Sequence, residues 1–467
     1  MIHEVFSPEI AYFGLFLVSL WLSGTLFEQV LRCRLLGELL IGIIFGNLGI
    51  GTLLPADKTV FVLAGDIGVL GLIFEAGLST GLHKLLRAGP RGALVALVGT
   101  MVPLATGYGY IYALLQQHAI QDGGAEGTTP NIVTEALASG AALASTSVAC
   151  AISLMKQQGL LETSVGTLIT TAAMIDDIAS LILLGIVAGF GGSESDIGAM
   201  TIVQPILSSL GVILVGLLGC IAVTKSKTRQ SVKQATEMRV VSEAGQENSS
   251  ADAAQTGKEE EEITDSPNIR RHEALYKYTF SPAVKLAAVL TVGLGYSILA
   301  EYLGSSRLLG AFVAGVFFSP FEALKALYDE QISHKLQPAM SAIFFATIGF
   351  AIPLSKILDP SLFGWGVVYA VIASLAKLVT ALLAPSEPGE AQYSSTRKQG
   401  LSERWMVGTA MIARGELGLL MVQQALLQGV MTQAVMIVTT WSIILCTLVG
   451  IGALSLVMRK ISVQRQD

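Results

Sequence analysis

The chain has 467 residues, of which 52% are hydrophobic and 14% are charged, and its formal net charge is −6. Soluble domains carry about 25% charged residues, so this composition excludes an ordinary soluble protein and predicts an all-α polytopic membrane protein. The basic residues form no cluster of the kind that binds nucleic acid. The first residues also lack a basic region ahead of the first full-length apolar run, so we expect no cleavable signal peptide.

Membrane-spanning helices are predicted wherever about 20 consecutive residues are mostly apolar, which gives about thirteen spans. Lys and Arg collect in alternate loops, namely those after the first, third, fifth, seventh, ninth and eleventh spans, and again after the last span. Because basic loops stay on the cytoplasmic side, we predict an outside N terminus, an inside C terminus and an odd number of spans. The predicted spans lie at 9–29, 36–54, 58–79, 89–115, 131–155, 164–190, 200–224, 279–301, 305–323, 337–356, 361–384, 404–428 and 431–458.

Residues 225–277 interrupt this pattern with a polar stretch that includes the acidic run Glu259–Glu262. Such a composition is typical of a disordered cytoplasmic linker, either a solvated insertion or a regulatory segment. The linker divides the chain into two halves. Spans one to six and eight to thirteen then form two equal sets offset by seven, and an odd offset turns the second set upside down. The sequence therefore predicts the inverted repeats found in many secondary transporters.

Spans five and twelve correspond in this repeat, and polar residues interrupt both of them at mid-depth. Irregular backbone at that depth is tolerated only where it lines a cavity or is buried in protein, so paired interruptions indicate a transport site. In span five, Thr146 and Ser147 offer hydroxyl and carbonyl oxygens to a hard monovalent cation, although small residues also serve ordinary helix packing. In span twelve, we expect Arg414 and Glu416 to neutralise each other and the ends of the broken helix.

Two adjacent carboxylates, Asp176 and Asp177, lie in the middle of the otherwise uncharged segment 165–190. A carboxylate at that depth costs a few kcal/mol or more, and like charges side by side disfavour joint ionisation. Neighbouring residues on a helix point about 100° apart, so one aspartate can face a cavity while the other faces a neighbouring helix. This arrangement predicts exchange of protons for a cation; the alternative is a structural pair buried against a positive partner.

Among the other ionisable residues inside predicted spans, three are candidate site residues. Lys377, in span eleven, must be paired or must lose its proton; a carboxylate of the aspartate pair is the expected partner, and snorkelling toward the cytoplasm is the alternative. In span three, Asp66 is expected near an outer vestibule and Glu75 nearer the inside, unless each makes a polar contact between helix bundles.

The cysteines show no spacing typical of a metal site or of a disulfide. We interpret them as small packing residues and expect no cofactor. They are scattered in or beside apolar runs, at Cys33, Cys150, Cys220 and Cys446.

Several segments together resemble the monovalent cation:proton antiporter superfamily, in its cation:proton antiporter 2 family. The resemblance lies in AAMIDDIASLIL from Ala172, RLLGAFVAGVFFSP from Arg307, GELLIGIIFGNLGIG from Gly37, IFEAGL, FFATIGFAI from Phe344 and ARGELGLLM from Ala413. Both the two-aspartate sodium/proton antiporters and the potassium-efflux antiporters share these strings. The efflux type commonly has Gln-Asp where this chain has Asp176 and Asp177, and it often carries a nucleotide-binding domain, so the resemblance favours the sodium type.

The resemblance also implies an architecture and roles. Segments 1–80 and 278–357 would form a scaffold and a homodimer interface, and segments 81–190 and 358–460 would form a moving core with two crossed broken helices. Segment 191–224 would be a linker helix, followed by the 225–277 loop. Asp177 would bind the monovalent cation, and Asp176 would pair with Lys377.

We therefore predict a secondary antiporter, not an enzyme, that exchanges sodium for protons, with lithium as a further cation. The alternatives are potassium/proton exchange, a channel, a non-transporting sensor and an intramembrane aspartyl protease. A channel requires a continuous pore, which suits these acids less well than alternating occupancy. The protease requires two aspartates on different helices, whereas these two are adjacent on one helix. The retained Asp176, Asp177 and Lys377 argue against a sensor.

Overall fold

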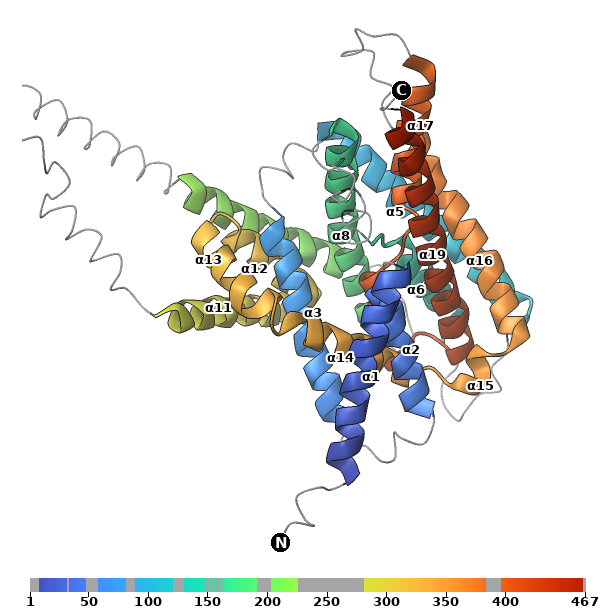
Figure 1. The fold of residues 1–467 in the computed structure, drawn as a ribbon, viewed down its shortest axis with the longest axis horizontal. Helices are drawn as coiled ribbons and strands as arrows, with labels where there is room; N and C mark the ends of the chain where they lie inside the picture. The colour runs from blue at the N-terminus through green and yellow to red at the C-terminus, as the bar shows by residue number, and fades with distance from the viewer. Residues whose placement is uncertain are drawn as a thin grey trace, which may run out of the picture.

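The computed structural model describes residues 8–31, 33–47, 58–80, 89–120, 130–147, 152, 155, 160, 163–190, 203–225, 281–383 and 396–464. Within these ranges every regular element is helical, as Figure 1 shows, which confirms the predicted all-α class. The predicted linker beyond residue 225, the second half of span five apart from residues 152 and 155, and Cys150 lie outside the described residues.

The helices of the first half are α1 (Pro8–Leu31), α2 (Arg34–Asn47), α3 (Lys58–Ser79), α5 (Gly89–Gln116), α6 (Ile132–Ala144), α8 (Ser164–Phe190) and a helix at Val203–Lys225. Those of the second half are α11 (Pro282–Tyr302), α12 (Arg307–Phe318), α13 (Glu322–Tyr328), the π-helical turn Asp329–Ser333, α14 (Gln337–Phe350), α15 (Leu354–Ile357), α16 (Pro360–Leu378) with its 3-10 extension Val379–Leu383, α17 (Thr396–Ala410), α18 (Glu416–Leu427) and α19 (Gln433–Gln464).

Local sequence explains where several of these helices begin. Side-chain oxygens accept hydrogen bonds from otherwise unpaired N–H groups of the first turn, which is the capping role that Asn, Ser and Asp perform best. Pro282 and Pro360 follow two of these caps at the first helical position, where a missing N–H costs nothing. The capping residues are Asn131 for α6, Ser281 for α11, Ser306 for α12 and Asp359 for α16.

Length and hydropathy place the chain in a membrane. In the described part, seven helices are long and apolar enough to cross a bilayer: those within α1, α5, α8, Val203–Lys225, α11, α16 and α19. Four shorter apolar helices accompany them, namely α6, α12, α14 and α18. The protein is therefore a multi-pass integral membrane protein, and the total of about thirteen spans stays a prediction.

The helices pack in two sets. In the first set α3 packs on α12 and α14, α2 packs on α1 and α14, and α11 packs on α12; in the second, α5, α6, α8, α16, α17, α18 and α19 pack on one another. In Figure 1, α11, α12 and α13 lie on the opposite side of the molecule from α16, α17 and α19. Small residues allow the close crossings that lipid-embedded helices need: a Cβ at Gly77 of α3 would collide with the Phe312 carbonyl of α12. Contacts between the sets run from α8 to α12 and from α14 to α18.

Candidate functional site

The two predicted interruptions are present and touch each other. After α6 ends at Ala144, residues 145–147 are non-helical, and residues 411–415 separate α17 from α18. The backbone N–H of Ser147 donates to the carbonyl of Ala413 at 2.8 Å. Only glycine fits at residue 415, because a Cβ there would lie 2.6 Å from the Cβ of Ser147. The two broken helices therefore meet at their irregular segments, where backbone groups are released from helical hydrogen bonding.

Beside this contact, a chain of four polar side chains links four elements. Thr100 of α5 lies 2.5 Å through its Oγ1 from Oδ1 of Asp176 in α8. The other carboxylate oxygen, Oδ2, lies 3.3 Å from Nζ of Lys377 in α16. Lys377 Nζ also donates to Oγ1 of Thr146, in the interruption after α6, at 2.7 Å. Both charged side chains are 0% exposed, so the Lys377 ammonium does not snorkel to the surface of the chain.

Burial of this pair has an energetic consequence. A charge removed from water is stable only when it is paired and its remaining hydrogen-bonding capacity is used. Asp176 meets both conditions, because one of its oxygens faces the Thr100 hydroxyl and the other faces the Lys377 ammonium. The charge of Asp176 therefore depends on the helices that supply its partners. A displacement of α5 or α16 would leave this charge in an apolar interior without one of its partners.

Asp177 occupies a different environment from its neighbour. Its side chain is only partly buried, and no hydrogen bond or ion pair within 4.0 Å reaches its carboxylate from the described residues. The charged groups that act on it electrostatically are Glu416, Asp176 and Lys377. The two aspartates thus have different surroundings, as adjacent residues on a helix allow. Each carboxylate oxygen of Asp176 has a partner in the protein, whereas both oxygens of Asp177 are available to a ligand.

Arg414 and Glu416 each lie at a broken-helix end. The Arg414 guanidinium is buried and donates through Nη1 to the Ser145 carbonyl at 2.9 Å and through Nη2 to the Ala373 carbonyl at 3.3 Å. It therefore covers the C-terminal end of α6, where a positive charge is favourable, and Glu416 stands in the first turn of α18, where a negative charge is favourable. Within the described part of the chain, no ion pair joins Arg414 directly to Glu416.

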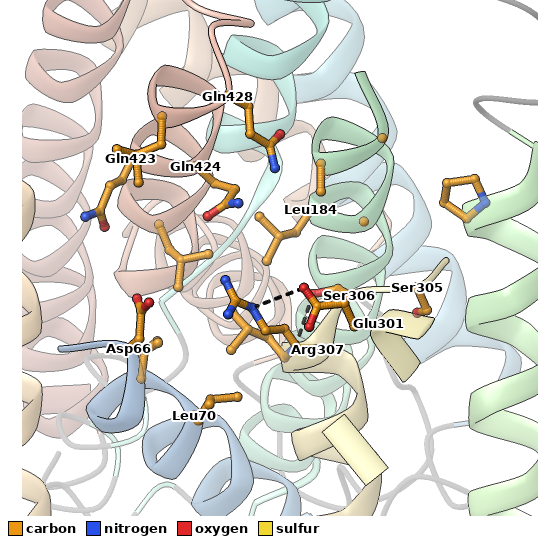
Figure 2. Close-up of a pocket in the computed structure, with 18 of the residues that line it drawn as sticks. Asp66, Leu70, Leu184, Glu301, Ser305, Ser306, Arg307, Gln423, Gln424 and Gln428 are labelled. Carbon is orange, nitrogen blue, oxygen red and sulfur yellow. Dashed lines mark hydrogen bonds and ion pairs between the residues drawn. The ribbon is translucent and has the colours of Figure 1, made fainter. Parts of the chain in front are cut away.

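A cavity of about 670 Å³ separates the two helix sets near the ends of α8 and α18. Figure 2 shows Asp66 pointing into it from α3, and Gln424 and Gln428 approaching from α18. The guanidinium of Arg307 lies 3.8 Å from the Glu301 carboxylate at the same cavity. Charged and amide groups from both sets therefore face one water-accessible space.

The cavity stops short of the aspartates. The first cavity-lining residue of α8 after Asp177 is Leu184, and the first of α18 after Glu416 is Leu420. At 1.5 Å rise per residue these leucines stand about 10 Å beyond Asp177 and about 6 Å beyond Glu416 along their helices. Both leucines are buried, as is Phe344 of α14 at the same cavity. Asp177 and Glu416 therefore do not line this cavity, whose nearest lining residues on their helices are apolar.

Two other residues predicted from sequence have clear positions. Glu75 accepts a hydrogen bond from Ser333 Oγ at 2.6 Å, which ties α3 to the π-helical turn, and it does not line the cavity that Asp66 faces. Ser147 is buried and contributes its backbone N–H to the contact between the breaks. Among the described residues no group of three His, Cys, Asp or Glu side chains could hold a metal ion, and Cys33, Cys220 and Cys446 are buried.

Thr100 is the residue of this site that sequence analysis missed. It is one hydroxyl in an apolar helix, 76 positions before its partner Asp176. Nothing in the local pattern distinguishes it from Thr106, six residues later in the same helix.

A multi-pass helical membrane protein in which two interrupted helices meet beside buried ionisable side chains is a secondary transporter. The chain belongs to the transmembrane sodium/hydrogen exchanger family, because the sequence profile of that family matches residues 15–241 and 274–459. It is therefore a membrane transporter of monovalent cations and protons and not an enzyme.

Individual relatives extend over most of the chain. A probable Na(+)/H(+) antiporter, GerT of Bacillus cereus, is 25% identical over 89% of this chain and 90% of its own length. The Na(+)/H(+)-K(+) antiporter GerN of the same organism is 24% identical over 93% and 92%, and an Na(+)/H(+) antiporter of Enterococcus hirae is 24% identical over 83% and 82%. The solved structure of the sodium proton antiporter MjNhaP1 from Methanocaldococcus jannaschii shares the fold, with a TM-score of 0.61, 16% identity, and coverage of 97% and 98%.

Proposed function

We propose that this protein is a secondary active antiporter that exchanges sodium for protons by alternating access, with Asp177 as the shared binding site. The observation that carries the proposal is the contrast between the two aspartates. Asp176 is fully buried and bonded to Thr100 and Lys377, whereas Asp177 is partly exposed and has no hydrogen-bond partner among the described residues. The relatives GerT and the E. hirae protein are named as Na(+)/H(+) antiporters, which supports sodium as the cation.

Coupling follows from competition at one carboxylate. Asp177 can hold either a proton or a cation but not both, so each movement of the site carries one or the other. Cation binding adds positive charge close to Lys377, which acts electrostatically on Asp177. We propose that Lys377 then releases a proton as well, which would make the exchange two protons for one cation.

The interrupted helices supply the remaining oxygen ligands in this proposal. Ser147 is the better candidate of the two hydroxyl residues, because the Thr146 hydroxyl already accepts a hydrogen bond from Lys377. Arg414 and Glu416 stabilise the charges of the helix ends, so the released backbone groups keep their positions beside the ion.

Alternating access would be a movement of one helix set against the other. In this proposal segments 1–80 and 278–357 are the scaffold and the homodimer interface, segments 81–190 and 358–460 are the moving core, and segment 191–224 connects them. The cavity lies between α3 and α12 on one side and α8 and α18 on the other, so displacement of the two sets would widen or narrow it. With the orientation predicted from the basic loops, this cavity faces the non-cytoplasmic side.

The test is exchange by the purified protein in proteoliposomes that contain a pH-sensitive dye. An imposed sodium gradient should drive proton flux that protein-free liposomes lack, and lithium should substitute for sodium. Potassium is the informative comparison, because GerN carries potassium in its name. Proton flux with potassium but not with sodium would replace the sodium proposal by potassium/proton exchange. Absence of flux with all of these cations would overturn the antiporter proposal itself.

A further inference from the structure

Thr100 makes contacts that an ordinary helical threonine does not make. A threonine inside a helix commonly donates its hydroxyl proton to the carbonyl four residues earlier. Thr106, in the same helix, bonds only to its own helix, at 2.9 Å to the Val102 carbonyl and 3.3 Å to the Pro103 carbonyl. Thr100 has the same option at the Ala96 carbonyl, 2.9 Å away, but its Oγ1 also lies 2.5 Å from Asp176 Oδ1.

The Thr100 hydroxyl has a single proton, so it can donate to only one of these two acceptors. A hydroxyl has one proton to donate, and an ionised carboxylate can only accept. With Asp176 ionised and paired to Lys377, the short contact requires Thr100 to donate to Oδ1. A hydrogen bond to a charged acceptor is about twice as strong as one to a neutral carbonyl, so Asp176 and not Ala96 receives the proton.

The consequence is geometric. Asp176 Oδ1 is held by α5 and Oδ2 by Lys377 of α16, so the plane of the carboxylate is fixed from two sides. Thr100 is 1% exposed, and its removal would leave Oδ1 as an unpaired buried acceptor. The carboxylate could then turn both oxygens toward Lys377 and away from α5.

We infer that Thr100 is a positioning residue for exchange, which holds Asp176 so that only Oδ2 is presented to Lys377. The inference rests on the proposed antiport function and adds to it a residue that touches neither the cation nor the ammonium group. Its contribution comes from the hydroxyl and not from the methyl group. Removing the hydroxyl should therefore slow the cycle while leaving cation binding at Asp177 largely intact.

Three single variants test this in the proteoliposome assay. Thr100→Val keeps the shape and removes the hydroxyl; it should lower the maximal rate of sodium-driven proton flux by about tenfold or more, as expected for a lost bond to a charged group. Its KM for sodium should change by less than about threefold, since each tenfold would need 1.4 kcal/mol of altered binding. Thr100→Ser keeps the hydroxyl and should restore the rate. Thr106→Val is the matched control and should exchange like the unmodified protein.

A double variant separates positioning from packing. If Thr100 acts through Asp176, Thr100→Val should add little to the defect of Asp176→Asn, because the charge that it positions is already absent. An unimpaired Thr100→Val protein, or a Thr100→Ser protein as slow as Thr100→Val, would overturn the inference. If valine prevents folding, Thr100→Ala provides the same loss with a smaller side chain. If the unmodified protein itself shows no flux, the proposed antiport function is refuted instead.

Discussion

Replacing Lys377 with methionine should destabilise the fold more than any exposed lysine replacement. Methionine has nearly the length of lysine, so the change removes the ammonium group without opening a large cavity. Asp176 would then remain 0% exposed with only Thr100 as its partner. Thr146 would also lose the Lys377 ammonium that lies 2.7 Å from its hydroxyl.

The size of the effect follows from burial. Removing one partner of a buried ion pair costs about 3–5 kcal/mol, because an uncompensated charge is left behind. Replacing both partners with uncharged residues is often close to neutral. Lys377→Met alone should therefore be strongly destabilising, and the double variant Lys377→Met with Asp176→Asn should recover most of the loss. The recovery is the distinctive expectation, since two unrelated core changes would add their costs.

Denaturant unfolding of the purified protein, followed by tryptophan fluorescence in mixed micelles, measures these differences. Lys285→Met, at an exposed lysine of α11, is the matched control and should change the unfolding free energy little. Equal stability of Lys377→Met and the control would refute the buried pair. A double variant less stable than Lys377→Met would refute the charge-compensation argument while leaving the burial of Lys377 intact.

Three further predictions concern transport and assembly. With two protons exchanged for one cation, an imposed membrane potential should change the flux, and a rate insensitive to that potential would favour one-for-one exchange. A tag inserted within residues 225–277 should be protected from protease added outside intact cells, because basic loops stay cytoplasmic; cleavage from outside would reverse the orientation. In native-like lipid the protein should have the mass of two 49.1 kDa chains, and a persistent single-chain mass would contradict the proposed homodimer.

Much of the fold was accessible from sequence because the bilayer imposes simple rules. The prediction of a helix at 164–190 matches α8 (Ser164–Phe190), since a long apolar run ends there in glycines and polar residues. The interruptions in spans five and twelve were also predictable, because polar residues at mid-depth need released backbone or buried partners. Burial of Asp176 followed from its position in an uncharged segment.

Other features depend on tertiary contacts that no local pattern carries. Thr100 meets Asp176 only when α5 and α8 pack, and the two residues are 76 positions apart in the sequence, so no local pattern indicates the pairing. The predicted span 361–384 changes from α16 to a 3-10 helix after Leu378, where the Thr380 hydroxyl donates to the Lys377 carbonyl at 2.7 Å. Arg414 and Glu416 were expected to neutralise each other and the ends of the broken helix. No ion pair joins them among the described residues; Arg414 donates to the Ser145 carbonyl at the end of α6, and Glu416 lies in the first turn of α18.

The most direct test of the proposed mechanism is sodium-driven proton flux through Asp177→Asn in proteoliposomes, measured beside the unmodified protein. Asparagine keeps the shape of the side chain but cannot bind a proton in exchange for a cation. Because Asp177 has no hydrogen-bond partner among the described residues, the substitution should leave expression and folding nearly intact. We predict flux no greater than in protein-free liposomes, and a smaller defect in Asp176→Asn if that residue serves mainly to hold Lys377. Full exchange by a well-folded Asp177→Asn protein would contradict the competition of proton and cation at this carboxylate.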